Sequence, residues 1–151
     1  LGSGSKTEEN AFLNIAKEFP DRLAAFIGCD AALARRIFAG TDFFIMPSRF
    51  EPCGLAQQYA MRYGSVPIGR KTGGLADTIQ PIQESKKTGN GFLFDKAEAE
   101  PLLKVINKAI ELFEHRSCYD QIQKNALNLA CSWEFAAEDY QKVYSWALAD
   151  A

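Results

Sequence analysis

The sequence is poor in the residues that build metal centres. It has one histidine, His115, and four cysteines that form no CxxC pair, which are Cys29, Cys53, Cys118 and Cys131. Zinc sites use closely spaced cysteine and histidine ligands, so the spacing here predicts free thiols in a reducing compartment and no metal site. His115 lies near an expected helix end, where a role in solvent or beside the helix carbonyls is favoured over catalysis.

The sequence also lacks an excess of one charge and lacks long apolar runs. Its 17 Lys and Arg residues stand against 19 Asp and Glu residues, which gives a net charge of -2. No basic run could follow a phosphate backbone, so nucleic acid is disfavoured as a partner. No apolar run approaches the roughly 20 residues of a membrane span, and no secretory leader opens the sequence. We expect no membrane partner and a location in the cytosol or a plastid stroma.

What remains has the composition and patterning of an α/β domain. The chain has 151 residues, of which 47% are hydrophobic and 24% charged, enough for a hydrophobic core. Short apolar runs, expected to be buried strands, occupy 22–28, 42–47, 65–69 and 91–94. Helical patterns occupy 7–19, 30–40, 54–64, 73–79, 98–113, 118–130 and 133–149. Their alternation predicts a Rossmann-like open parallel sheet with helices on both faces and a helical C-terminal tail.

Local residues predict where these helices begin and where one surface loop lies. Thr7 and Asp30 stand before helical patterns, so they are expected to cap the first two helices. Residues 80–91 are polar and contain glycine, and we expect them to form a mobile surface loop. The aromatic residues between Trp133 and Trp146 have helical spacing, which favours packing over a sugar-stacking role.

The loop after the expected strand 42–47 carries most of the chemistry. Ligands of open α/β sheets bind at the carboxyl ends of strands, where loops lead into helices. This loop, PSRFEPCGL, holds Arg49, Glu51 and the backbone amides of Cys53, Gly54 and Leu55. Such amides bind anions or hydroxyls. The alternative is structural: Pro52 merely starts the helix, and Glu51 offsets the helix dipole.

A second loop, RKTGGLADT, follows the expected strand 65–69. Its glycine pair, Gly73 and Gly74, would allow a close approach of the backbone to a ligand, and Thr72 precedes the pair. A plain tight turn is the alternative. Since both loops follow successive strands, one pocket could receive hydrogen-bond donors from both.

PSRFEPCGL followed by TGGLADT resembles the bacterial glycogen synthase and plant starch synthase family. The resemblance extends over nearly the whole chain, from LGSGS to SWEFAAEDYQKVYSWAL. It implies one lobe of the two-lobe glycosyltransferase-B fold. The family transfers glucose from ADP-glucose, with UDP-glucose as the other possible donor, to the non-reducing 4-hydroxyl of an α-1,4-glucan. It retains the anomeric configuration and uses neither a metal nor a cofactor.

The resemblance also implies roles for individual residues. Glu51 is similar to the family glutamate at the donor sugar, and the amides of Cys53 and Gly54 would hold glucose hydroxyls, while those around Leu55 would face the diphosphate. The remaining donor-binding candidates are Gly28, Cys29, Arg49, Tyr59, Thr72, Gly73 and Gly74. Two of them depart from the pattern. Cys29 stands where members often have an aromatic residue on the adenine, and Tyr59 stands where wider relatives have a glutamate on the ribose.

The same resemblance predicts that residues 1–151 are the C-terminal, nucleotide-sugar-binding lobe, incomplete at its N-terminal edge. The acceptor-binding lobe and the cations that neutralise the diphosphate would lie upstream of Leu1, so we expect this chain alone to be inactive. Two alternatives stay open at this point. One is a stand-alone nucleotide or sugar-nucleotide binding module without catalysis, and the other is a structural remnant that binds nothing.

Overall fold

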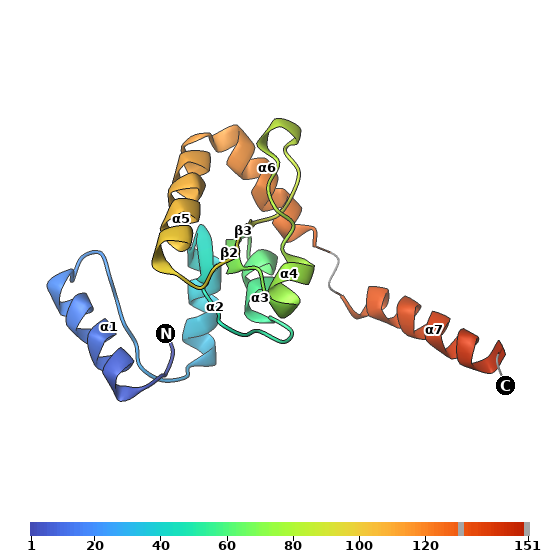
Figure 1. The fold of residues 1–151 in the computed structure, drawn as a ribbon, viewed down its shortest axis with the longest axis horizontal. Coiled ribbons are helices and arrows are strands. Elements are labelled where there is room, and N and C mark those ends of the chain that lie inside the picture. The colour runs from blue at the N-terminus through green and yellow to red at the C-terminus, as the bar shows by residue number, and fades with distance from the viewer. Residues whose placement is uncertain (130–131, 150–151) are drawn as a thin grey trace. The chain divides into compact units, whose positions relative to one another are not determined.

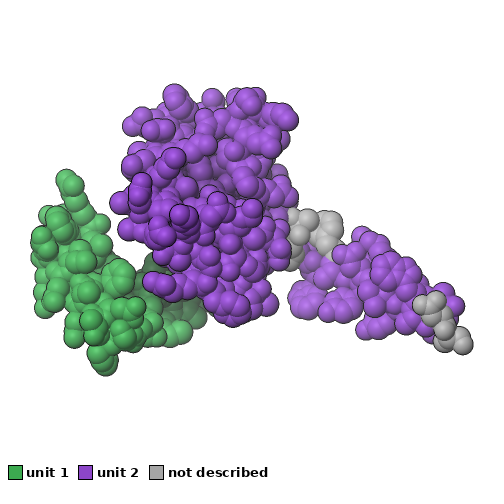
Figure 2. Space-filling model, in the orientation of Figure 1, with its two compact units in different colours: residues 1–40 green, residues 41–151 purple. Residues whose placement is uncertain are grey.

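The computed structural model describes residues 1–129 and 132–149, with the helices and strands shown in Figure 1. They fall into two compact units, Leu1–Gly40 and Thr41–Ala151, which Figure 2 shows in green and purple. In the part of the chain that is described, no helix is both long and apolar enough to cross a membrane.

The first unit contains helices α1 (Lys6–Glu18) and α2 (Ala31–Gly40). Ser5, and not Thr7 as predicted, caps α1. The Ser5 hydroxyl accepts from the Glu8 amide, and the Ser5 amide donates to the Glu8 carboxylate at 3.0 Å. The Ser5 hydroxyl also donates to the Glu8 carboxylate at 2.7 Å, and this bond, followed by that from the Ser5 amide, lowers the pKa of Glu8 because both favour its charged form. Thr7 lacked this advantage, since the reciprocal capping box needs a glutamate three residues after the cap, as Glu8 is after Ser5.

Asp30 caps α2 as predicted, but the expected strand at 22–28 does not form. The Asp30 carboxylate accepts from the amides of Ala32 and Leu33, both at 2.9 Å. In the run before it, Ile27 makes a single parallel bridge with Gly2, and Phe26 is 48% exposed. A strand needs a ladder of partners along its length, and this run has one bridge.

The second unit contains a parallel sheet in the order β1-β2-β3. Its strands are β1 (Phe43–Met46), β2 (Val66–Arg70) and β3 (Phe92–Phe94), and all three strand predictions in this unit are confirmed. Helix α3 (Ala56–Arg62) connects β1 to β2, and α4 (Gly73–Thr78) follows β2. The register pairs Ile45 with Ile68 and Ile68 with Phe92, so the carboxyl ends of the strands lie along one edge.

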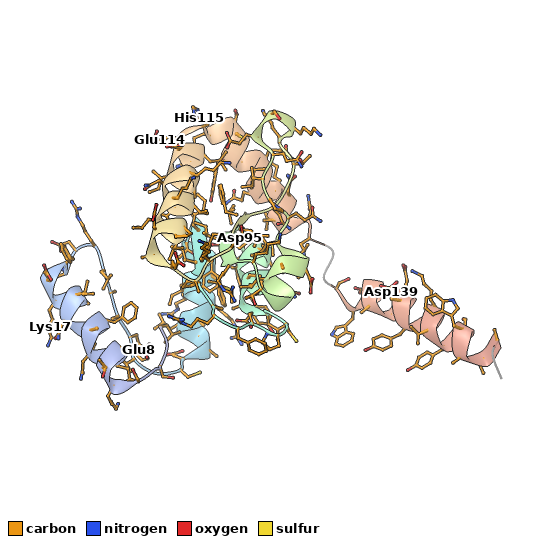
Figure 3. All side chains as sticks on the ribbon, viewed as in Figure 1. Glu8, Lys17, Asp95, Glu114, His115 and Asp139 are labelled. Carbon is orange, nitrogen blue, oxygen red and sulfur yellow. The ribbon has the colours of Figure 1, made fainter. Side chains whose placement is uncertain are left out.

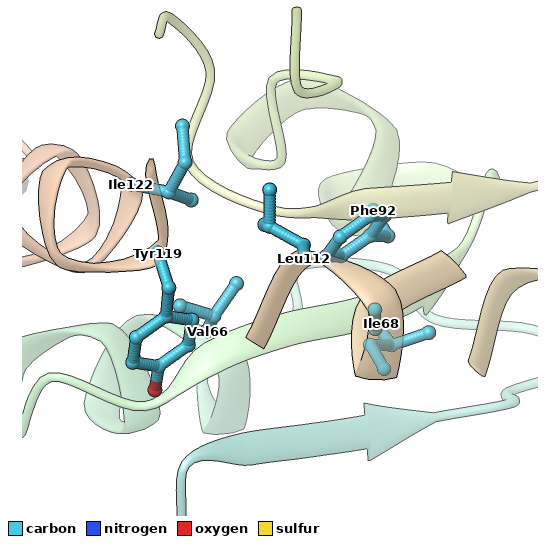
Figure 4. Close-up of a cluster of buried hydrophobic side chains, with 7 residues drawn as sticks. Val66, Ile68, Phe92, Leu112, Tyr119 and Ile122 are labelled. Carbon is cyan, nitrogen blue, oxygen red and sulfur yellow. The ribbon is translucent and has the colours of Figure 1, made fainter. Parts of the chain in front are cut away.

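One face of the sheet is covered by helices α5 (Ala99–Glu114) and α6 (Arg116–Leu127). Figure 4 shows this core, in which side chains of β2 and β3 pack against both helices; its buried members are Val66, Ile68, Phe92, Ala109, Leu112, Tyr119 and Ile122. The Tyr119 hydroxyl donates to the Asp42 carbonyl at 3.0 Å. Burial, reinforced by the negative charge of Asp42, raises the pKa of Tyr119 to about 12.

The opposite face carries a second, smaller core. Met46, Leu75 and Ile79 are buried there, with Phe44, Ala56 and Leu93 packed around them. Adjacent strand residues point to opposite faces, so Phe44 and Leu93 contact this core while Phe43 and Phe92 contact the first. The predicted α/β sheet with helices on both faces is therefore confirmed. Ile45, expected to be buried, is 43% exposed on the edge strand β1.

The segments outside the sheet complete the second unit. Residues 80–91 form the predicted surface loop, which is closed by bridges between Pro81 and Gly91 and between Gln83 and Thr88, around the short helix η1 (Glu84–Lys86). Helix α7 (Trp133–Ala149) has the predicted bounds. The helix predicted at 118–130 begins earlier and ends at Leu127; Ala130 and Cys131 lie outside the described residues.

Candidate functional site

The loop between β1 and α3, residues 47–55, is held by hydrogen bonds from a side chain that was not predicted from the sequence. Arg70, the last residue of β2, donates to the carbonyls of Ser48, at 2.6 Å, and Arg49, and a third contact joins it to the carbonyl of Asp95 at 3.4 Å. Asp95 follows the end of β3, where Figure 3 labels it. The guanidinium therefore joins the carboxyl ends of all three strands. Its one sequence signal was its place at the end of a buried strand.

The predicted catalytic residue, Glu51, lies half-buried in this loop. The Ser48 hydroxyl donates to the Glu51 carboxylate at 3.3 Å, a contact within the loop itself. The Glu51 carbonyl points the other way and accepts from the amide of Gly74 at 3.2 Å. Backbone and side chain of Glu51 are thus both engaged, and the carboxylate retains acceptor capacity for a ligand hydroxyl.

The glycine pair at the start of α4 lies directly against the same loop. A Cβ on Gly73 would lie 1.9 Å from the Glu51 carbonyl oxygen, and one on Gly74 would lie 1.7 Å from that of Cys53. The Gly74 amide also donates to the carbonyls of Glu51 and Pro52, both at 3.2 Å. Glycine is therefore needed at both positions because the start of α4 packs directly against the loop 47–55. The sequence had instead predicted that the glycine pair allows a ligand to approach the backbone.

The amides of Cys53, Gly54 and Leu55 have no acceptor among the residues that the structure describes, and the same holds for the amides of residues 48–51 in this loop. Cys53 and Leu55 are exposed, whereas Gly54 is buried and has φ of +67°, a conformation that favours glycine. Unpaired amides at exposed positions, as at Cys53 and Leu55, can bind a phosphate or a sugar hydroxyl without rearranging.

The other predicted donor-binding residues are divided between the two units. In the second unit, Arg49 has an exposed side chain, Thr72 precedes α4 without a side-chain cap bond, and Tyr59 is 54% exposed on α3. Gly28 and Cys29 belong to the first unit, where the Gly28 amide donates to the Gly2 carbonyl at 2.9 Å and Cys29 is exposed. Arg49, Tyr59 and Thr72 thus belong to the same unit as the loop, and Gly28 and Cys29 belong to the first unit.

No group of three or more His, Cys, Asp or Glu side chains suitable for a metal ion occurs within 1–129 and 132–149. His115 lies at the junction of α5 and α6, as Figure 3 shows, in agreement with its expected place near a helix end. The polar groups that this loop pair presents are backbone amides and one carboxylate. They can hold an anion at residues 53–55 and hydroxyls near Glu51.

Comparison with known proteins shows the same family for sequence and structure. Residues 5–126 match the family described as "Glycosyl transferases group 1". The chain is 42% identical over 148 residues to the glycogen synthase of Kosmotoga olearia and 44% identical over 149 residues to that of Thermosipho africanus. Each match covers 98% of this chain and 31% of the relative. The chain therefore spans less than a third of the length of these relatives.

Solved structures agree with the sequence comparison. The catalytic domain of starch synthase IV from Arabidopsis thaliana, bound to ADP and acarbose, superposes with a TM-score of 0.83 at 31% identity, over 98% of this chain and 31% of that one. A sucrose-phosphate synthase from Thermosynechococcus elongatus, 22% identical over 99% of this chain and 38% of that one, superposes with a TM-score of 0.66 and shows the shared fold. This chain belongs to the group 1 glycosyltransferases and is homologous to glycogen and starch synthases.

Proposed function

We propose that this chain is the C-terminal, donor-binding lobe of a glycogen or starch synthase. The enzyme would transfer glucose from ADP-glucose, or from UDP-glucose, to the non-reducing 4-hydroxyl of an α-1,4-glucan, in a bacterial cytoplasm or a plastid stroma. The observation that carries the proposal is the row of unpaired amides at Cys53, Gly54 and Leu55 beside the carboxylate of Glu51. The similarity to a starch synthase bound to ADP supports a nucleotide as the ligand.

Each candidate would have a separate task in donor binding. The amides of Cys53 and Gly54 would bind glucose hydroxyls, and the Leu55 amide would bind the diphosphate. Arg49, Tyr59 and the turn Thr72–Gly74 would contact the donor from the same unit. The roles of Gly28 and Cys29, in the first unit, stay predictions from the resemblance. Because the Gly74 amide already donates to two loop carbonyls, its part would be to hold the loop and not to bind the donor directly.

The chemistry follows from where charge develops. As the bond between the sugar C1 and the diphosphate oxygen breaks, negative charge grows on the leaving ADP and positive charge on the sugar ring. Fixed amides stabilise the first charge without reorganising, and the Glu51 carboxylate stabilises the second. The acceptor 4-hydroxyl then forms the new bond to C1 and gives its proton to the leaving diphosphate oxygen. Glu51 acts electrostatically in this scheme and forms no covalent bond.

Transfer needs more than this chain. The relatives are about three times as long, and we propose that the acceptor site and the cations for the diphosphate belong to the remainder. The purified 151-residue chain should therefore transfer no glucose from ADP-glucose to glycogen. Radiolabelled glucose incorporated into glycogen by the purified chain would overturn this part of the proposal.

Nucleotide binding by the isolated chain is the direct test. We expect ADP to bind with a Kd of roughly 0.1 to 10 mM, since a few amide contacts must offset the entropy that the ligand loses. Amide chemical-shift changes on ADP titration should concentrate in residues 47–59 and 70–76, with a smaller set at 28–30. Saturating ADP without any shift between Ser48 and Leu55 would contradict the assigned site.

A further inference from the structure

The side chain of Gln57 is completely buried beneath the loop of unpaired amides. Its relative exposure is 0%, and its Nε2 atom donates to the Thr78 hydroxyl at 2.9 Å. That hydroxyl in turn donates its single proton to the carbonyl of Gly74 at 2.6 Å. A carbonyl can only accept, so the Thr78 oxygen must accept from Gln57. This chain of bonds fixes the orientation of the Gln57 carboxamide.

The whole carboxamide lies against Gly54. A Cβ on Gly54 would lie 2.7 Å from Gln57 Oε1 and 2.6 Å from Nε2. Oε1 is buried and is without a hydrogen-bond partner among the described residues. Leaving a buried acceptor unpaired costs free energy, and an apolar side chain of similar size would avoid that cost. An apolar side chain could not donate to Thr78. We therefore attribute the presence of a glutamine at this position to its hydrogen bond with Thr78.

The loop has three attachments, each at a different place along it. Arg70 holds the carbonyls of Ser48 and Arg49, and the Gly74 amide holds those of Glu51 and Pro52. Gln57 is the attachment beneath Gly54, in the middle of the unpaired amides. A shift of this attachment would move the amides themselves and leave the first part of the loop in place.

We propose that Gln57 is a positioning residue that, through Thr78, sets the distance between the amides at 53–55 and helix α4. This inference rests on the proposed function, because the amides are taken to face the phosphates of a sugar nucleotide. Binding groups that are displaced by a fraction of an ångström lose much of their effect on a ligand. Gln57 does not touch the donor; it acts through the backbone of Gly54.

The test uses the 151-residue chain and compares two ligands, ADP and AMP. Gln57→Leu and Thr78→Val each remove the bond with little change of volume, and Thr78→Ser keeps the hydroxyl. Gln121→Leu is the matched control, because Gln121 is an exposed glutamine on α6 whose side chain, among the residues that are described, donates to Asn125 of the same helix. Kd values for both nucleotides come from amide shifts, and unfolding by urea gives the stability of each variant.

We expect Gln57→Leu and Thr78→Val to weaken ADP binding about tenfold, the equivalent of one misplaced bond to a charged group. AMP binding should fall by no more than about threefold, because it has one phosphate fewer. Thr78→Ser and Gln121→Leu should bind both nucleotides as the wild type does. Equal losses for ADP and AMP would mean a merely structural role and would overturn the inference, as would unchanged ADP binding.

A second measurement separates this inference from the proposed function. If the wild-type chain does not bind ADP, the proposed function fails. The positioning role is then tested without a ligand, by the heteronuclear NOE values of the amides at 53–55, which report how rigidly these amides are held. We expect these values to fall in Gln57→Leu and Thr78→Val and to stay high in Thr78→Ser. Wild-type values in both bond-deleting variants would overturn the positioning role.

Discussion

Replacing Gly74 by alanine tests the loop packing on which the whole site depends. The new Cβ would lie 1.7 Å from the Cys53 carbonyl oxygen and 2.2 Å from its carbon. Real Cβ atoms essentially never lie within 3.0 Å of a heavy atom outside their own residue and its chain neighbours, so the loop must move until this contact opens. Backbone cannot yield as the end of a flexible side chain can, and a shift of about 1 Å is enough to impair a binding site severely.

The expected cost in stability combines two effects. Overpacking of a close contact costs about 1 to 3 kcal/mol. The two weak hydrogen bonds from the Gly74 amide to Glu51 and Pro52 would also be lost or strained, and each contributes about 1 kcal/mol. Because the loop can relax, the losses overlap, and we expect Gly74→Ala to lower the free energy of unfolding by about 2 to 4 kcal/mol.

Urea unfolding and amide spectra measure both consequences of this change. The amide shifts of residues 51–55 should change in the free chain, and ADP should no longer shift them. Gly40→Ala is the matched control, since a Cβ there meets no heavy atom within 4 Å and Gly40 has no positive φ. That variant should be neutral or up to about 1 kcal/mol more stable. If Gly74→Ala kept wild-type stability and wild-type shifts at 51–55, the reasoning would be refuted.

Three further predictions concern the core and the proposed chemistry. Ile122→Ala, which empties a fully buried position, should cost about 2 to 5 kcal/mol by urea unfolding, whereas Leu103→Ala at an exposed position should cost no more than about 0.5 kcal/mol. The pKa of Tyr119 is raised to about 12 from an ordinary 10.0, so its contribution to stability is present below pH 10 and lost as pH rises towards 12. Tyr119→Phe should flatten this alkaline loss in a pH series of unfolding experiments, and an unchanged series would contradict the assignment. In a full-length enzyme of the proposed kind, Glu51→Ala should lower kcat on the order of 100-fold or more. A raised KM with normal kcat would instead assign Glu51 to uniform donor binding.

Local patterns in the sequence were sufficient for most elements of the second unit. The apolar runs at 42–47, 65–69 and 91–94 became β1, β2 and β3, because each is flanked by turn residues and finds a neighbouring strand. The residue stripe after Glu98 became α5, since helical periodicity is a property of one segment. The loop motif at 47–55 was recognised for the same reason: its residues are contiguous.

Tertiary structure decided whatever depends on partners distant in sequence. The run at 22–28 has the composition of a strand but forms a single bridge. Whether such a run becomes a strand depends on neighbouring strands to pair with, which its own composition does not determine. Gly73 and Gly74 were attributed to a ligand, whereas the close contact is with a loop some twenty residues earlier.

The roles of Arg70 and Gln57 likewise come from bonds that span 21 or more residues. A sequence specifies which groups can donate and accept; only the packed sheet brings Arg70 beneath Ser48 and Gln57 beneath Gly54. The candidate loop was therefore recognisable from its own residues, while the geometry that leaves the amides of residues 53–55 unpaired was decided by the fold, because backbone hydrogen bonds are satisfied or left open by neighbours in space.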